Sequence, residues 1–582
     1  EMVAPFAYAA ELREAGTERD SDTLNRDALP PFLAYSPDGL ITAPLVYANY
    51  GRREDLEALV ARGIGLRGAM LLVRYGQIFR GSKVRLAEEF GAVGVLIYSD
   101  PADDGFARGE VYPDGPFRPA TAVERGSILY LFEYPGDPGT PGRPSLAGAE
   151  QLTYDAMGSL PGIPAMCLSH ADARPFLESL AGPTVPKGWQ GGLPFTYHLG
   201  GEGRVRVQLQ IESDYRLRRI RNVEGLWPGL QFPDEEIIIG NHRDAWVHGA
   251  VDPGTGTAVT LEAARLIAER ARAGEPPQRS VRVCFWDGEE FGLLGSTEYG
   301  EQFAERLQRG TALYLNLDVA VSGDELRAAG VPVLEAPLRA ILAQGGPEFA
   351  LRSDYGDLGS GSDYTVFLDH LGIPSLDLGS SGPQGVYHSG YDTFGFVKRH
   401  IDPDFSRHAR MAGIVAEVAQ TFSRVALLPY DFAATGQAVR RHAMAVEGAH
   451  PQLDLAEIKE LGSQIETLGA KIAEARLQAE SGAALPLERL LAINHRQIAA
   501  ERALLLPDGL PGRPWYRHAL WAPARDLGYG AAPLPPLSDA AMSGDRAQIL
   551  EGAALLARAL RAHLAALESV RQSLVESPSE PG

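Results

Sequence analysis

The alternation of apolar and polar residues predicts that the first part of the chain is rich in β-strands. One apolar set alternates with arginine and glutamine at the period of a strand: Val205, Val207, Leu209 and Ile211. Further strands are expected at 44–48, 70–74 and 93–98, with a helix from about 82 to 90. We expect the strand at 203–213 to open the unit that follows.

The middle of the chain alternates apolar runs with helix-like segments. The runs lie at 235–240, 281–286, 312–318 and 373–378, and residues 257–272 have the period of a helix. Apolar strands that alternate with helices are typical of an α/β sheet covered on both faces.

Beyond about residue 425 the composition shifts to alanine, leucine, glutamate and arginine. Leucine and isoleucine recur at steps of three and four residues in two stretches, which begin at Leu455 and Leu556. They predict two long amphipathic helices on either side of a proline-rich segment, 505–536. Their apolar stripes fit a subunit interface or an intramolecular bundle.

Composition and charge narrow the classes of function. The 582 residues are 45% hydrophobic and 22% charged, which is ordinary for a globular protein of two or three domains. The net charge of −21 argues against a nucleic-acid partner. No apolar run approaches the ~20 residues of a membrane helix. The two cysteines, Cys167 and Cys284, lie in apolar runs and are expected to be buried free thiols.

Metal-ligating residue types follow several of the predicted strands. They are His242, Asp244, Asp252, Glu289, Glu290, Asp318 and His388. Singly, such residues fit a loop hydrogen bond or a solvated turn. Together they fit zinc in an imidazole and carboxylate site, because ligands collect at the carboxyl ends of strands in open α/β sheets.

Several segments resemble the zinc aminopeptidase-like metallopeptidases, in the branch of glutamate carboxypeptidase II and the transferrin receptor. The similar segments include 75–81, 98–103, 235–244, 288–297 and 358–363, and the likeness extends over nearly the whole chain. It implies a mixed-sheet α/β peptidase core, a β-rich protease-associated domain and a C-terminal helical dimerisation domain. We place these units at 213–425, 1–212 and 426–582. A helical segment that usually precedes the protease-associated domain in the family is not found.

The resemblance implies a centre with two zinc ions. His242 and Asp318 would bind one ion, Glu290 and His388 the other, and Asp252 both. Zinc would acidify a water molecule, for which an unligated Glu289 is the expected general base. Asp244 is expected to orient the His242 imidazole.

The resemblance also implies a substrate site for a C-terminal residue. Arg80, Tyr387 and Tyr529 would hold the terminal carboxylate, and Ser362 would also contact substrate. Ser127 and Gly528 replace the asparagine and lysine that hold a glutamate side chain in the family. Asp377 and Gly379 replace a cationic pair near the preceding substrate residue. We therefore expect no strong preference for glutamate.

A calcium site is a further implication of the resemblance. Glu298 and Glu301 match a pair of carboxylates in the family, and Thr140 and Arg143 fall where oxygen ligands come from the neighbouring domain. Calcium accepts oxygen ligands in flexible geometry. Exposed glutamates on a helix are the alternative.

The expected activity is that of a carboxypeptidase acting on small peptides or N-acyl amino acids, as a homodimer. An aminopeptidase is the main alternative, and Asp377 is its candidate anchor for a substrate amine. A non-catalytic scaffold is disfavoured, because all five ligand positions and Glu289 are present. A serine hydrolase lacks a clear nucleophile elbow. By resemblance, the protein is expected to be secreted, periplasmic or on the cell surface.

Overall fold

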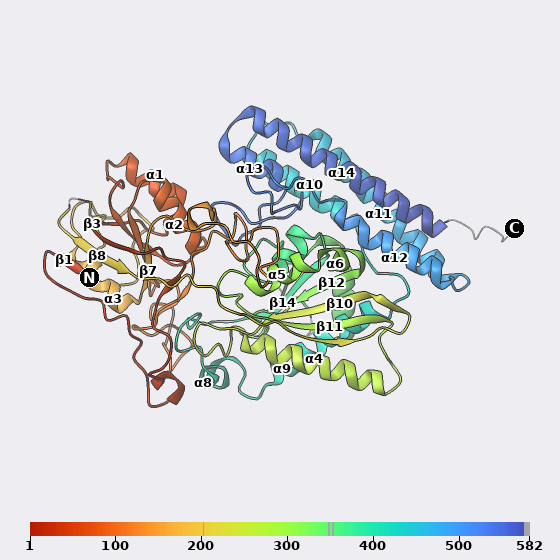
Figure 1. Cartoon of the computed structure of the whole chain (residues 1–582), viewed down its shortest axis with the longest axis horizontal. Helices are drawn as coiled ribbons and strands as arrows, with labels where there is room; N and C mark the ends of the chain where they lie inside the picture. The colour runs from red at the N-terminus through yellow and green to blue at the C-terminus, as the bar shows by residue number, and fades with distance from the viewer. Residues whose placement is uncertain (202, 347–349, 352–353, 576–582) are drawn as a thin grey trace.

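The structure, a computed structural model, describes residues 1–201, 203–346, 350–351 and 354–575. Each of the three predicted units therefore contains some residues outside the described part. Figure 1 shows an N-terminal unit on one side, a second sheet beside it and long helices along one edge. None of the helices in the described residues has the length and apolar character to cross a membrane.

The N-terminal unit is built around a six-stranded sheet. Its strands, in spatial order, are β1 (Met2–Ala4), β8 (Arg206–Ile211), β3 (Gly39–Tyr47), β4 (Met70–Arg74), β5 (Gly94–Tyr98) and β7 (Ala165–Leu168). The last four run parallel to one another. The helices of this unit are α1 (Arg53–Ala61), α2 (Arg80–Glu89) and α3 (His170–Ser179). A separate parallel pair joins β2 (Leu33–Ala34) to β6 (Gly126–Ser127).

One prediction is wrong here. Strand β8 does not open the second sheet but pairs antiparallel with β3 and β1. The alternation was read correctly, because Val207 and Leu209 are buried in the N-terminal core. A period of two shows that a strand has one buried face, but it does not show which sheet buries that face.

The second sheet has four parallel strands between two antiparallel edge strands. Its order is β13 (Glu325–Gly330), β14 (Ser375–Ser381), β12 (Thr311–Asn316), β10 (Phe232–His242), β11 (Arg279–Trp286) and β9 (Val223–Trp227). Residues 237–239 and 313–315 are fully buried. Such continuous apolar runs are expected of parallel strands covered on both faces.

Helices cover this sheet on both sides. In Figure 1, α4 (Gly254–Arg272) and α9 (Ser406–Arg424) lie below it, and α5 (Leu294–Gln302) and α6 (Ala304–Gly310) lie above it. Helix α7 (Glu335–Gly345) contacts α9, and the short α8 (Phe394–Phe396) follows the last strand. The mixed α/β core predicted from the sequence is confirmed.

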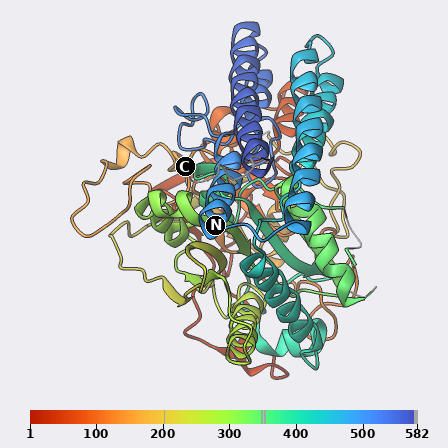
Figure 2. The same ribbon diagram turned by 90° about the vertical axis from the view of Figure 1, so that its right-hand side faces the viewer.

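The C-terminal helices stand side by side as a bundle (Figure 2). They are α10 (Phe432–Ala449), α11 (Ala456–Ser481), α12 (Leu487–Arg502), α13 (Pro535–Ser543) and α14 (Arg546–Val575). The sequence predicted α11 and α14. Helix α10 was not predicted. Its backbone packs closely against that of α11 at Gly436, where a Cβ atom would lie 2.4 Å from the Gly462 carbonyl oxygen. A pattern of large apolar residues does not reveal such close backbone contact.

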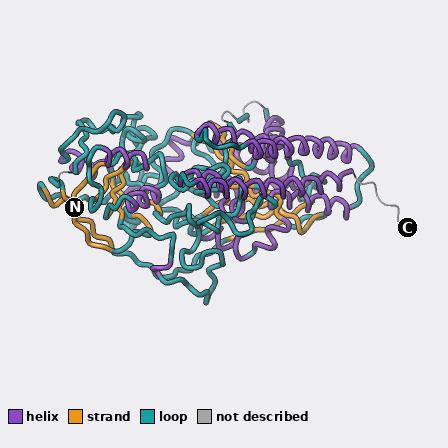
Figure 3. Tube along the Cα trace, turned by 90° about the horizontal axis from the view of Figure 1, so that it is seen from above, coloured by secondary structure: helices purple, strands orange, loops and turns teal. Residues whose placement is uncertain are grey.

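The segment between α12 and α13 returns to the N-terminal unit. Most of that unit is drawn as loops in the view from above (Figure 3). Arg513 is buried and binds both oxygens of Asp539, at 2.8 and 2.9 Å. It also donates to the Phe132 carbonyl oxygen at 3.2 Å, and the Tyr516 hydroxyl donates to the Leu131 carbonyl oxygen. These contacts fix the segment that contains Tyr529 against the N-terminal unit.

Candidate metal centre and substrate cavity

The predicted metal ligands meet at the carboxyl ends of the parallel strands. His242 is the last residue of β10, and Glu289 and Glu290 follow β11. Asp318 lies just beyond β12, and Asp252 lies just before α4. The first turn of α4 approaches closely, because a Cβ on its Gly256 would lie 1.9 Å from the Leu317 carbonyl oxygen. Only glycine permits this approach.

Two groups of side chains converge, and Asp252 lies between them. His242 Nε2 is 2.8 Å from Asp318 Oδ1 and 3.2 Å from Asp252 Oδ1. His388 Nε2 is 3.1 Å from Glu290 Oε2 and 3.3 Å from Asp252 Oδ2. One oxygen of Asp252 therefore faces each imidazole, as a carboxylate shared by two cations requires.

Both imidazoles are oriented through their other ring nitrogen. His242 Nδ1 lies 3.1 Å from the Asp244 carbonyl oxygen, and His388 Nδ1 lies 3.0 Å from that of Arg125. A backbone carbonyl only accepts hydrogen bonds, so each Nδ1 carries the proton and each Nε2 is free to bind a metal. His388 has a φ of 58°, and the Arg125 amide donates to its carbonyl oxygen at 3.2 Å.

Asp244 contacts the His242 imidazole, as expected, but through its backbone. Its carbonyl oxygen, and not its carboxylate, accepts the hydrogen bond from His242. The carboxylate oxygens accept instead from the backbone amides of Glu289, at 3.0 Å, and Glu290, at 3.2 Å. Asp244 thus positions the loop after β11 as well as the imidazole.

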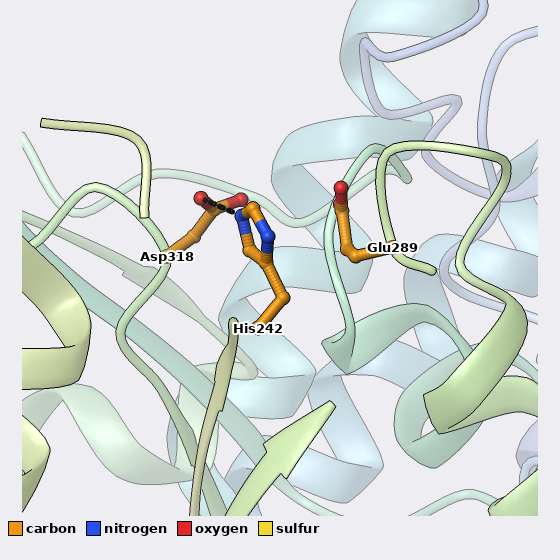
Figure 4. Close-up of side chains that lie close together, drawn as sticks. All are labelled: His242, Glu289 and Asp318. Atoms are coloured by element: carbon orange, nitrogen blue, oxygen red, sulfur yellow. Dashed lines mark hydrogen bonds and ion pairs between the residues drawn. The ribbon is translucent and has the colours of Figure 1, made fainter. Parts of the chain in front are cut away.

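Glu289 lies on the far side of His242 from Asp318 and has no drawn bond to either residue (Figure 4). The oxygen atoms of Glu289 nevertheless lie close enough to the ligand atoms of His242 and Asp318 for the three side chains to hold one metal ion. Asp252, Glu290 and His388 form a second such group. Burial raises the pKa of the Glu289 carboxyl well above its usual range; His242 opposes this shift, and Asp318 and Asp363 add to it.

These residues fit a pair of divalent cations. Four carboxyl groups and two imidazoles are crowded into a largely buried space, and within the described residues Glu290 Oε1 is buried without a hydrogen-bond partner. Carboxylates so close together repel one another, and bound cations remove this cost. Imidazole nitrogen and carboxylate oxygen are ligands that zinc accepts.

A cavity of about 30 Å³ adjoins both groups. Arg80 lies in its wall, buried, with Nη1 at 2.9 Å from the Tyr529 hydroxyl. Ser127 and Tyr387 also line it. Phe79, Leu131 and Leu293 contribute apolar side chains to its lining, which also includes Gly292 and Gly361.

Two predicted substrate residues do not line the described cavity walls. Ser362 lies behind Asp318, to which its hydroxyl donates at 2.8 Å. Asp377 is paired with Arg327 at 3.0 Å and accepts from Asn316 at 2.9 Å. We therefore revise both expectations: Ser362 orients a predicted ligand, and the charge of Asp377 is already neutralised.

Sequence reasoning missed Arg327 and Glu124. Arg327 lies on the edge strand β13, antiparallel to the strand that contains Asp377, so only the register brings the two together. Glu124 accepts from Arg80 Nη2 at 3.1 Å. Neither residue belongs to a motif, and no local pattern marks them.

The predicted calcium residues come partly together. Glu298 accepts from the Asp137 amide at 2.9 Å, and Glu301 accepts from the Trp515 indole at 2.8 Å. Burial raises the pKa of Glu298 to about 7 and that of Glu301 to about 8. The Thr140 hydroxyl is buried without a partner in the described residues, whereas the Arg143 side chain turns away to the Glu150 carbonyl oxygen.

Comparison with protein families agrees with this geometry. Residues 222–414 match the model of peptidase family M28, 41–131 match the PA domain and 455–568 match the transferrin receptor-like dimerisation domain. The chain belongs to peptidase family M28, whose members are zinc metallopeptidases. The two accompanying domains place it in the branch of glutamate carboxypeptidase II and the transferrin receptor, as the sequence predicted.

Three curated relatives illustrate this membership. Aminopeptidase NAALADL1 of Rattus norvegicus is 35% identical over 545 residues, which are 85% of this chain and 73% of that protein. Probable glutamate carboxypeptidase LAMP1 of Arabidopsis thaliana is 35% identical over 556 residues, 92% and 78% of the two chains. Probable glutamate carboxypeptidase of Arthroderma benhamiae is 33% identical over 580 residues, 94% and 79%.

The shared position of Asp252 leads to a prediction about metal content. We expect zinc-loaded wild-type protein to contain two zinc ions per chain. Asp252→Asn should lower the occupancy of both sites, because the amide loses the negative charge and has only one oxygen. Glu290→Gln should affect one ion more than the other. Elemental analysis after removal of free zinc measures this, and equal losses in the two variants would contradict a shared Asp252.

Proposed function

We propose that this zinc peptidase is an exopeptidase that removes the C-terminal residue of small peptides or N-acyl amino acids. The supporting observation is the position of Arg80, a buried guanidinium in the wall of the cavity beside both candidate metal groups. Its planar fork suits a carboxylate, and the hydroxyls of Tyr529 and Tyr387 would complete the binding of the substrate's terminus.

The proposed ligands are those predicted from the sequence: His242 and Asp318 for one ion, Glu290 and His388 for the other, and Asp252 for both. When bound, zinc supplies Lewis acidity, which polarises the scissile carbonyl group and acidifies the attacking water. Glu289 is the proposed general base. Its carboxylate takes a proton from the attacking water and returns it to the leaving nitrogen.

The pocket does not favour glutamate as the released residue. A side chain at position 528 has no room, because Gly528 has a φ of 81° and a Cβ there would lie 2.3 Å from Phe79 Cβ. The lysine of the family therefore has no equivalent here. Phe79, Leu131 and Leu293 contribute apolar side chains instead, and Arg80 is the single arginine or lysine among the described lining residues.

Cleavage from the amino end remains the second candidate, since the relative from Rattus norvegicus is named an aminopeptidase. Such an enzyme needs an acidic anchor for the substrate amine. Asp377, the candidate from the sequence, is bound to Arg327 and Asn316, which disfavours this role.

Three expectations from the resemblance stay predictions. The homodimer is supported by the match to a dimerisation domain, and a calcium site by the burial and the raised pKa values of Glu298 and Glu301. Location outside the cytoplasm rests on the resemblance alone.

The role of Glu289 can be tested by an isosteric substitution. We expect Glu289→Gln to keep its fold and zinc content but to lose about 10²- to 10⁴-fold in kcat, because an amide cannot accept the proton. Steady-state kinetics and zinc analysis of one preparation measure both effects. Nearly unchanged turnover with full zinc would assign the base to another residue.

The direction and specificity of cleavage can be tested with substrates that differ only at the last residue. N-acylated dipeptides ending in leucine, phenylalanine or methionine should give higher kcat/KM than the dipeptide ending in glutamate. A buried carboxylate without a partner costs about 3–5 kcal/mol, which is two or more powers of ten in affinity.

Arg80→Ala serves as the comparison variant and should abolish cleavage of these blocked substrates. A tenfold preference for glutamate would contradict the pocket assignment. Cleavage of free-amine aminoacyl anilides, but not of the blocked dipeptides, would favour the aminopeptidase.

A further inference from the structure

A row of alternating charges runs from the cavity wall into the N-terminal unit. Arg80 Nη2 lies 3.1 Å from Glu124 Oε1, and Glu124 Oε2 lies 3.7 Å from Arg118. Arg118 in turn binds Asp104 at 2.6 Å and donates to the Tyr387 carbonyl oxygen at 3.1 Å. The two arginines are buried, the Glu124 carboxylate is 11% exposed, and only Asp104 reaches the surface substantially.

Glu124 is the carboxylate that neutralises Arg80. The described residues provide no other ion-pair partner for this guanidinium. The nearby His388 Nδ1, at 3.5 Å, does not accept from Arg80, because its proton is directed at the Arg125 carbonyl oxygen. Glu124 is absent from the described cavity walls and lies behind Arg80.

A substrate carboxylate that binds the cavity side of Arg80 therefore shares this guanidinium with Glu124. Two carboxylates on one guanidinium are close enough to repel each other in a largely buried site. The repulsion weakens binding of any carboxylate at this position, and it acts on the released amino acid as well as on the substrate.

We propose that Glu124 is a specificity-determining residue, a built-in counter-ion of Arg80 that limits affinity for the terminal carboxylate; this inference rests on the proposed cleavage from the carboxyl end. Glu124 neutralises the charge of Arg80 when the cavity is empty. When the product dissociates, the Arg80 guanidinium therefore still has an ion-pair partner. The same charge disfavours a second carboxylate, such as a glutamate side chain, in the pocket.

The test is Glu124→Gln, which keeps the shape of the side chain and removes its charge. For an N-acylated dipeptide with a free carboxyl terminus, we expect KM to fall about tenfold, or ~1.4 kcal/mol. The inhibition constant of the released amino acid should fall equally, while kcat stays unchanged or decreases as product release slows. The C-terminal amide of the same dipeptide should show no gain.

Glu133→Gln is the matched control. Glu133 is also shared by two guanidinium groups, those of Arg525 at 3.1 Å and Arg85 at 3.8 Å, but neither of these arginines lines the described cavity. This variant should leave the inhibition constant of the amino acid unchanged. Should Glu124→Gln not fold, Glu124→Asp withdraws the charge from Arg80 and should shift KM in the same direction by a smaller factor.

A KM or inhibition constant that rises or stays constant in the Glu124 variant would overturn the proposal, as would an equal gain for the amide or for the control. Failure of the proposed function looks different: the wild-type enzyme would not cleave the blocked dipeptide at all. That result would remove this inference together with the function on which it rests.

Discussion

Repulsion among carboxylates at the ends of parallel strands is the constraint on which this structure depends. Asp252, Glu289, Glu290 and Asp318 lie within a few ångströms of two imidazoles, largely out of water. Such an arrangement is unfavourable without compensating positive charge. The surrounding groups therefore hold each side chain in place: backbone carbonyls orient the imidazoles, Asp244 caps the loop after β11, and Ser362 restrains Asp318.

The cavity depends on all three parts of the chain. The N-terminal unit supplies Arg80, the second sheet supplies the acids and histidines, and the segment after α12 supplies Tyr529. Arg513 and Tyr516 bind this segment to carbonyl oxygens of the N-terminal unit. The backbone of Arg125, in the N-terminal unit, also forms hydrogen bonds with the backbone and the imidazole of His388. The N-terminal unit therefore contributes both to the wall of the cavity and to the position of His388.

The sequence was sufficient for features that depend on local pattern. Apolar runs with acids and histidines at their ends predicted the strands and the residues that converge there, because parallel strands deliver their carboxyl ends to one edge. The sequence was insufficient for contacts between residues that lie far apart along the chain. The sheet to which β8 belongs, the pairing of Asp377 with Arg327, and the approach of α10 to α11 through Gly436 all depend on register or backbone contact.

The central proposal is that Asp252 would be shared by two zinc ions and that Glu289 would bind neither. Anomalous diffraction at the zinc absorption edge, from crystals of the zinc-loaded protein, tests this most directly. We predict two zinc peaks, one on each side of the Asp252 carboxylate, the first beside His242 and Asp318 and the second beside Glu290 and His388. A single peak, or a zinc ion ligated by Glu289 in place of Asp252, would contradict the account.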